Sequence, residues 1–205
     1  MKILLILGHP KPTSFNHALA EKAMATLKEL GHEIVLHDLY QEHFDPVLPD
    51  GEDNLPEEKL PEFIKEHLRN FKEAGGVVIV HPNWWGGPPA ILRGWVDRVL
   101  RTNSCYNFTP NGVETYVGGK IVQIFSTSNT PRDVEMNLYG DPIENFWKTV
   151  VFGIIGSQSF ERRNFESIVM STPEERQSWL AEVEAVLKRR FYHKDHTPGD
   201  HSNIR

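Results

Sequence analysis

The chain has 205 residues, of which 28 are acidic and 22 are Lys or Arg, giving a formal net charge of −6. With 39% hydrophobic residues, this length can bury the core of one sizeable α/β domain without disulfides or structural metals. The composition excludes collagen-like, low-complexity and wholly disordered chains, and the negative charge argues against nucleic acid as a partner.

Cysteine and hydropathy patterns point to a reducing, aqueous environment. The single cysteine, Cys105, leaves no intramolecular disulfide and no cysteine-rich zinc site. No apolar run approaches the ~18 residues of a membrane span, and the run at residues 3–7 is too short for a secretory signal. We therefore expect a cytoplasmic protein that is not integral to a membrane.

Apolar runs alternate with amphipathic patterns along the chain. A strand buried in a parallel sheet reads as a continuous apolar run, whereas apolar residues three or four positions apart indicate a helix. Strands are predicted at residues 3–8, 33–37, 76–81, 120–125 and 150–155, and helices at residues 15–30, 61–74, 90–100, 143–149 and 173–191, with a long loop at 41–61. This alternation predicts one domain over residues 1–192, a doubly wound five-stranded parallel sheet with helices on both faces, and a loose polar tail at 193–205.

Open α/β sheets bind ligands at the carboxyl ends of their strands, where the strand order reverses. The first loop at that edge, residues 8–16, combines hydroxyls, an amide and a helix N-terminus. Backbone N–H groups, Ser14 and Asn16 would hold an anionic phosphate there. The loop lacks the glycine patterns of dinucleotide-binding Rossmann proteins and of ATP-hydrolysing P-loops. A capped helix start without a ligand is the alternative.

The second loop, residues 82–89, is the most unusual stretch of the chain. Trp84 and Trp85 stand beside two glycines and two prolines. Such a loop would form a rigid aromatic wall with backbone open to close approach, as a flat heteroaromatic ligand requires. Core packing is the alternative, and it accounts poorly for two tryptophans in one loop.

The third loop, residues 126–131, again follows a predicted buried strand. Its hydroxyls and amide are suited to hydrogen bonding with the polar edge of a ring, and an ordinary turn is the alternative. Its significance comes from its position beside the other two loops.

Several motifs, read in order, resemble the NAD(P)H:quinone oxidoreductase family of flavoproteins, which includes bacterial quinone reductases and potassium-efflux regulatory oxidoreductases. The similarity runs from about Lys2 to Phe191, and the stretch from Trp85 to Arg98 is its most specific part. The matching residues are His9, Thr13-Ser14-Phe15-Asn16 and Ala18, then Asp38-Leu39-Tyr40 with Phe44-Asp45-Pro46, then Pro82, Trp85, Gly87 and Pro89-Ala90-Ile91-Leu92-Arg93-Gly94-Trp95-Val96-Asp97-Arg98-Val99.

The resemblance implies a flavodoxin-like fold with strand order 2-1-3-4-5, a bound flavin and a homodimer with active sites at the subunit interface. The flavin would be FAD or FMN, with FAD favoured by the closeness of residues 9–16 to FAD-binding members. By the same resemblance, His9, Ser14, Phe15, Asn16 and Ala18 would hold the flavin phosphate, Pro82, Asn83, Trp84, Trp85 and Gly86 would contact the isoalloxazine, and Ser126, Thr127, Ser128 and Asn129 would flank its other edge.

Two departures from the family pattern affect the expected chemistry. The chain has Thr127-Ser128-Asn129 where the family usually has Thr-Thr-Gly-Gly, so the backbone cannot approach the ring through the same conformations. Tyr139 stands where mammalian-type members carry a histidine, and no tyrosine matches their other catalytic position. A phenol can donate a hydrogen bond, but it does not titrate near neutral pH as imidazole does. Both a catalytic and a packing role remain open for Tyr139.

Other reactive residue types are assigned structural roles. The ten histidines show no metal-binding spacing, so we expect no metal site and, except for His9 in the first loop, solvated or capping roles. Arg98 and Arg101 are expected on solvated helix faces or ends, with Arg98 available to pair with a carboxylate across a dimer. Cys105 has no neighbouring base and is expected to be a packing residue.

The predicted activity is that of a flavin-dependent oxidoreductase. Hydride would pass from NADH or NADPH to flavin N5 and then to a quinone or similar acceptor, in ping-pong alternation. One alternative is a flavin-bound regulatory or ancillary subunit of a transporter or other partner, with weak turnover. A flavodoxin-like electron carrier is a poorer fit, because the phosphate loop is longer and carries Phe15-Asn16.

Overall fold

A five-stranded parallel sheet forms the centre of the molecule. The computed structural model describes residues 1–192. The strands are β1 (Lys2–Leu7), β2 (Glu33–Asp38), β3 (Gly76–Pro82), β6 (Ile121–Thr127) and β7 (Ser159–Phe165), in the order β2-β1-β3-β6-β7. Counted by themselves they have the order 2-1-3-4-5, so the predicted fold class is confirmed. The predicted tail at residues 193–205 lies outside the described residues.

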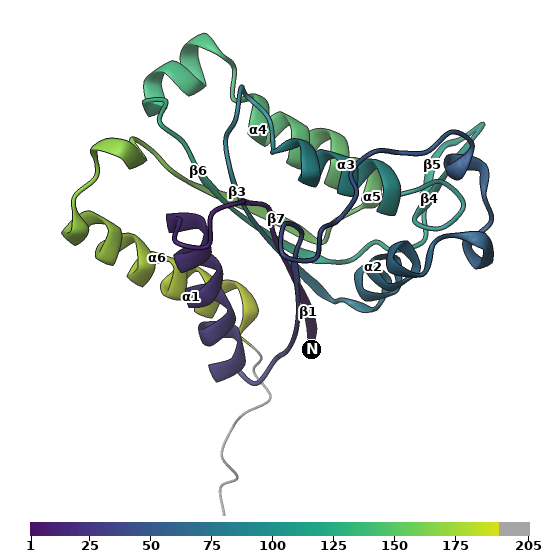
Figure 1. Cartoon of the computed structure of the whole chain (residues 1–205), viewed down its shortest axis with the longest axis horizontal. Coiled ribbons are helices and arrows are strands. Elements are labelled where there is room, and N and C mark those ends of the chain that lie inside the picture. Colours follow the sequence, from purple (N-terminus) through teal and green to yellow (C-terminus); the bar gives the residue numbers. More distant parts are fainter. Residues whose placement is uncertain (193–205) are drawn as a thin grey trace, which may run out of the picture.

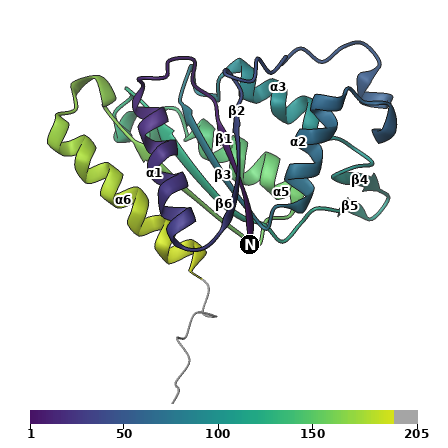
Figure 2. The same cartoon turned by 60° about the horizontal axis from the view of Figure 1, so that its bottom comes forward.

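Helices cover both faces of the sheet (Figures 1 and 2). One layer consists of α1 (Phe15–Glu29) and α6 (Pro173–Phe191), and the other contains α2 (Glu62–Glu73), α3 (Ala90–Val99) and a helical segment made of α4 (Pro142–Glu144), η4 (Asn145–Val151) and α5 (Phe152–Ile155). Alternate strand residues face opposite layers, because side chains alternate along a strand. Leu4 and Val77 belong to the core under α2 and α3, whereas Leu5 and Val78 belong to the core under α1 and α6.

The fifth strand lies later in the chain than predicted. The run at residues 150–155 is helical, and the strand follows it as β7. Val151, Phe152 and Ile155 are buried whereas Val150 is 51% exposed, as on a helix that buries one face. Periodicity in so short an apolar run does not separate strand from helix. The sequence of β7 is charged and does not show the apolar run expected of a buried strand. In the folded protein its arginines pair with carboxylates from other segments.

Residues 41–61 form the predicted long loop, interrupted by the short 3-10 helices η1 (Glu52–Asn54) and η2 (Glu57–Lys59). Arg98 fixes this loop to α3, since its Nη2 and Nε lie 2.6 and 2.8 Å from the two carboxylate oxygens of Glu52. Arg101 donates to backbone carbonyls of the same loop. The expectation of solvated arginines was therefore wrong, and Arg98 pairs within its own chain.

One further element was not predicted from the sequence. It is a two-stranded antiparallel sheet of β4 (Tyr106–Thr109) and β5 (Gly112–Thr115).

Among the described residues, no helix combines the length and apolar character needed to cross a membrane. Cys105 is fully buried, and burial raises the pKa of its thiol to about 11, as expected for a packing residue.

Several histidines are buried rather than solvated, contrary to expectation. The indole N–H of Trp147 donates to His81 Nε2 over 2.8 Å, and that of Trp95 donates to His67 Nδ1 over 3.1 Å. Burial lowers the pKa of His67 to about 3 and that of His81 to about 4. Both imidazoles therefore serve as neutral hydrogen-bond acceptors inside the fold.

These two histidines should make stability depend on pH. In the unfolded chain they take up protons near pH 6.5, whereas in the folded protein they stay neutral until about pH 4 or lower. The free energy of unfolding should fall as pH decreases below 6.5, by about 1.4 kcal/mol per pH unit for each histidine. Urea unfolding at pH 7, 6 and 5 measures this slope. His67→Gln should have a shallower slope, and equal slopes in both proteins would contradict the assignment.

Candidate functional site

The three loops singled out in the sequence line one cavity of about 340 Å³ at the carboxyl ends of β1, β3 and β6. Its walls are formed by His9, Lys11, Thr13, Ser14, Phe15, Asn16, Pro82, Asn83, Trp84, Thr127, Ser128, Asn129, Ile168 and Arg176. Ten of the predicted site residues are in this lining. Ala18, Trp85, Gly86, Ser126 and Tyr139 are not.

The start of α1 forms one end of the cavity. Ser14 caps this helix, its Oγ accepting from the backbone N–H of His17. The unpaired N–H groups and dipole of a helix N-terminus favour an anion. Lys11 and Arg176 add two cationic side chains to the walls. This end of the cavity is therefore suited to a phosphate or diphosphate.

Asn16 offers a hydrogen-bonding atom that the protein itself does not use. Its Nδ2 donates to Thr127 Oγ1 over 3.0 Å, linking the first loop to the third. Its buried Oδ1 has no hydrogen-bond partner among residues 1–192. A buried acceptor without a partner costs free energy, and a ligand hydroxyl at the cavity wall would satisfy it.

The second loop presents its two tryptophans to solvent. The backbone groups of Trp84 and Gly87 exchange two hydrogen bonds of 3.0 and 3.1 Å. Between them, Trp85 and Gly86 have φ of 57° and 74°, as in a type I′ turn. The Trp84 side chain is 42% exposed and lies 6.0 Å from the His9 ring, and Trp85 is fully exposed. Neither ring is packed in the core.

The third loop contributes fewer residues than expected. Ser126 is buried beneath the cavity, where its Oγ donates to Asn164 Oδ1 over 2.8 Å and accepts from Arg162. It is therefore not available to a ligand. Thr127 and Ser128 line the cavity, and Asn129 lies at its edge with Oδ1 accepting from the backbone N–H of Val169.

Tyr139 is placed outside the cavity. It follows the π-helical segment η3 (Val134–Leu138) and is 58% exposed, so it is not a packing residue of the core. Its segment lies beside the second loop, since a Cβ built on Gly86 would be 3.2 Å from Pro142 Cγ. Ala18, on the first turn of α1, is partly buried and does not reach the cavity.

Two of the lining residues that were not predicted come from distant sequence. Ile168 follows β7, and Arg176 lies on α6 with its guanidinium 5.9 Å from the ring of Phe15. Arg176 is held there by hydrogen bonds to Ile168 O and Ser171 Oγ. No local motif marks either residue, because their positions depend on the packing of α6 against α1. Lys11 and Thr13 lie within the predicted first loop but were not singled out.

A second cluster has the composition of a metal site. The ligand atoms of His37, Glu42 and His67 lie within 4.8 Å of one another. However, Asn70 Nδ2 donates to His37 Nε2, and the Trp95 indole donates to His67 Nδ1. Each imidazole therefore carries its proton on the nitrogen that faces Glu42, at 2.9 and 3.5 Å. Because a metal needs a lone pair on that nitrogen, this cluster is a hydrogen-bond network.

Known proteins resemble this chain in sequence and fold. An uncharacterized NAD(P)H oxidoreductase of Haemophilus influenzae is 36% identical over 114 residues, which are 55% of this chain and 56% of the relative. NAD(P)H dehydrogenase [quinone] 1 of Rattus norvegicus is 32% identical over 125 residues, covering 52% and 46%. These alignments span about half the length of the curated relatives.

A solved structure covers more of the chain. Smu.1420 of Streptococcus mutans matches with a TM-score of 0.82 at 28% identity, covering 92% of this chain and 100% of that one. The family model described as the flavodoxin-like fold matches residues 1–190. The resemblance found in the sequence motifs is thus confirmed, and the chain belongs to the flavodoxin-like fold family.

Proposed function

We propose that the protein is a flavin-dependent NAD(P)H oxidoreductase that reduces a quinone or a similar acceptor. One observation carries the proposal: a single cavity is lined by a helix N-terminus with two cationic side chains and by Trp84, whose loop also carries the exposed Trp85. A flavin has the same two parts, a phosphate and a flat ring. The similarity to quinone reductases over half of their length supports the same activity.

The residues of the chain would bind and orient the reactants. A bound flavin would accept hydride from NADH or NADPH at N5 and pass it to the acceptor, in alternating turnover within one pocket. The α1 N-terminus, Ser14 and Asn16 would hold the phosphate and ribityl chain. Trp84 and Trp85 would stack on flat rings, and Thr127 and Ser128 would donate hydrogen bonds to the polar ring edge.

We favour FAD over FMN. Residues 9–16 resemble the loop of FAD-binding members of the family, and Lys11 and Arg176 line the cavity beside that loop, where they would pair with phosphate groups. Mass spectrometry of the cofactor extracted from the purified protein identifies which flavin is bound.

Tyr139 is proposed as a hydrogen-bond donor to the acceptor. It is exposed on the segment beside the second loop, which supports contact with a molecule that stacks on the tryptophans.

The alternative function for the protein, a flavin-bound regulatory subunit, would bind flavin without useful turnover. A steady-state assay with NADH or NADPH and a soluble quinone separates the two functions.

We also propose a cytoplasmic location, which the NAD(P)H co-substrate and the single buried thiol support.

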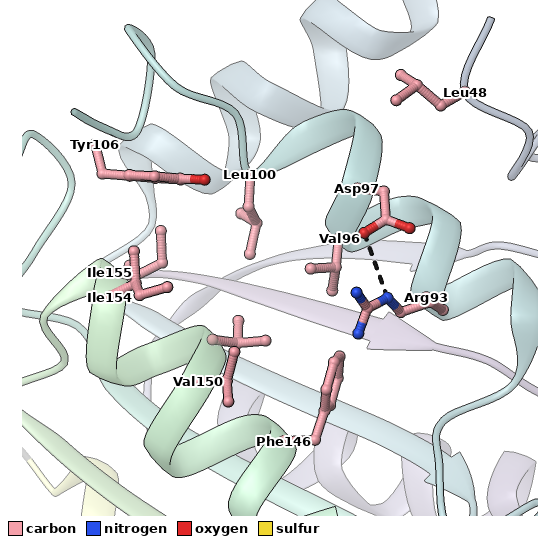
Figure 3. Close-up of a pocket in the computed structure, with 11 residues that line it drawn as sticks. Leu48, Arg93, Val96, Asp97, Leu100, Tyr106, Phe146, Val150, Ile154 and Ile155 are labelled. Atoms are coloured by element: carbon pink, nitrogen blue, oxygen red, sulfur yellow. Dashed lines mark ion pairs between the residues drawn. The ribbon is translucent and has the colours of Figure 1, made fainter. Parts of the chain in front are cut away.

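We also propose a homodimer formed through an apolar groove between α3 and the helical segment of η4 and α5. The groove holds about 350 Å³ and is lined by Leu48, Val96, Leu100, Phe146 and Val150 among others (Figure 3). Arg93 and Asp97 pair at its rim over 3.3 Å. A rim with both charges next to an apolar centre can complement itself across a twofold axis, which supports a second copy of this chain as the occupant.

The purified protein should be yellow and should bleach when NADH or NADPH is added without oxygen. Absorbance spectra of the full-length protein, before and after addition of each nucleotide, measure both effects. A colourless protein that takes up neither FMN nor FAD would overturn the proposed function.

Trp85→Ala should weaken flavin binding about tenfold, because aromatic stacking contributes about 0.5–1.5 kcal/mol beyond area burial. Trp85→Phe should restore most of the affinity, since it keeps a ring on the turn. Titration of flavin fluorescence measures the dissociation constants. Tyr192→Ala is the control, because Tyr192 is also exposed but follows the end of α6. Equal effects of Trp85→Ala and Tyr192→Ala would contradict the stacking role.

Val150→Glu should dissociate the dimer, because burying an unpaired carboxylate at the interface costs several kcal/mol. Sedimentation velocity at several concentrations measures the dimer dissociation constant, which should rise at least tenfold. Val169→Glu, an exposed valine outside the groove, should leave the dimer intact. A wild-type protein that is monomeric throughout would refute the homodimer and leave the flavin proposal untouched.

A further inference from the structure

The Trp85 side chain lies at a strained position of its turn and does not pack against the rest of the protein. A bulky residue at a φ of 57° is strained, and positive φ at the first central position of such a turn favours Asn, Asp or Gly. The Trp85 side chain is fully exposed, so packing does not offset the strain. Strained residues persist only where neighbouring structure holds them in place, and they cluster at functional sites.

Asn83 is the residue that closes this turn. Its Oδ1 accepts from the backbone N–H of Gly86 over 3.0 Å, and its own N–H donates to Thr127 O over 2.6 Å. The side-chain amide therefore joins the two ends of the segment that contains Trp84 and Trp85. A further contact, made by the nitrogen of the same amide, also sets its orientation.

Glu135 provides that contact from below. It is 2% exposed, and its Oε1 accepts from Asn83 Nδ2 over 3.3 Å while its Oε2 accepts from Asn164 Nδ2 over 3.0 Å. Burial raises the pKa of Glu135. Because Glu135 Oε1 accepts from the Asn83 amide, Asn83 directs its Nδ2 to Glu135 and its Oδ1 to the backbone N–H of Gly86.

Glu135 also forms one ion pair. Arg162 Nη1 lies 3.5 Å from Glu135 Oε1, whereas its closer contacts are with Asp141, at 2.5 and 2.7 Å, and with Glu144. The same Oε1 accepts from Asn83 over 3.3 Å. Glu135 therefore joins the Arg162 cluster to the Asn83 amide and is placed to orient that side chain.

We propose that Glu135 is a positioning residue that acts through Asn83 to hold the strained turn and present Trp84 and Trp85 to the ligand ring. The identity of that ring as a flavin rests on the proposed function, whereas the control of the turn by Glu135 does not. The required group is an acceptor oxygen facing Asn83. A negative charge is not required.

Hydrogen exchange of the Gly86 amide tests the turn without any flavin. In the full-length protein stripped of bound ligand, Glu135→Ala should speed this exchange about tenfold relative to the amides of β3, since a hydrogen bond of about 1–1.5 kcal/mol is lost. Glu135→Gln keeps an acceptor oxygen and should restore most of the protection. Glu144→Ala, which removes a different carboxylate from Arg162, should leave exchange within about twofold of wild type.

A double-mutant cycle locates the effect. Asn83→Ala should speed Gly86 exchange by at least as much as Glu135→Ala, and adding Glu135→Ala to it should cause no further change. Titration with FAD and FMN should show the same pattern in the dissociation constants, with each single variant about tenfold weaker than wild type.

Three outcomes would overturn the role of Glu135. Additive effects of Asn83→Ala and Glu135→Ala would show that Glu135 does not act through Asn83. Equal damage from Glu135→Gln and Glu135→Ala, or from Glu144→Ala, would show that the charge balance of Arg162 matters instead. Failure of wild type to bind either flavin would refute the proposed function alone, because Gly86 exchange would still report on the turn.

Discussion

The reversal of strand order between β1 and β3 is the constraint on which the rest of this molecule depends. The two strands are neighbours, yet α1 follows β1 onto one face of the sheet and α3 follows β3 onto the other. The loops that leave these strands must therefore diverge, and a crevice opens at their carboxyl ends. The start of α1 and the turn after β3 form its walls.

Polar groups inside the fold stabilise particular contacts around this crevice. Tryptophan N–H groups bond to neutral histidines, and the Arg98–Glu52 pair fixes residues 41–61 to α3. Each of these groups has a partner of matching chemistry, as buried polar atoms require. Asn16 Oδ1 departs from this pattern at the cavity wall. Asn16 and the exposed Trp84 line the same cavity, and the strained Trp85 follows Trp84 in the chain, which is why we propose binding there.

Elements with a local sequence signal were predicted correctly. Continuous apolar runs gave β1, β3 and β6, the weaker run at residues 33–37 gave β2, and the spacing of apolar residues gave α1 and α6. The three loops were found because each follows a predicted strand, and the second also carries two tryptophans. The fifth strand failed, because helix and strand cannot be distinguished in a six-residue apolar run and because β7 contains arginines that tertiary ion pairs neutralise.

The sequence by itself determined the fold class, the edge of the sheet that carries the site, and most residues of the cavity. Only the tertiary structure brought Arg176 and Ile168 into the cavity, buried Ser126 away from it, and placed Glu135 beneath Asn83. The reason is physical: periodicity and capping depend on neighbours along the chain. Contacts between distant residues depend on how helices pack on the sheet, and a single sequence does not encode that packing in any local pattern.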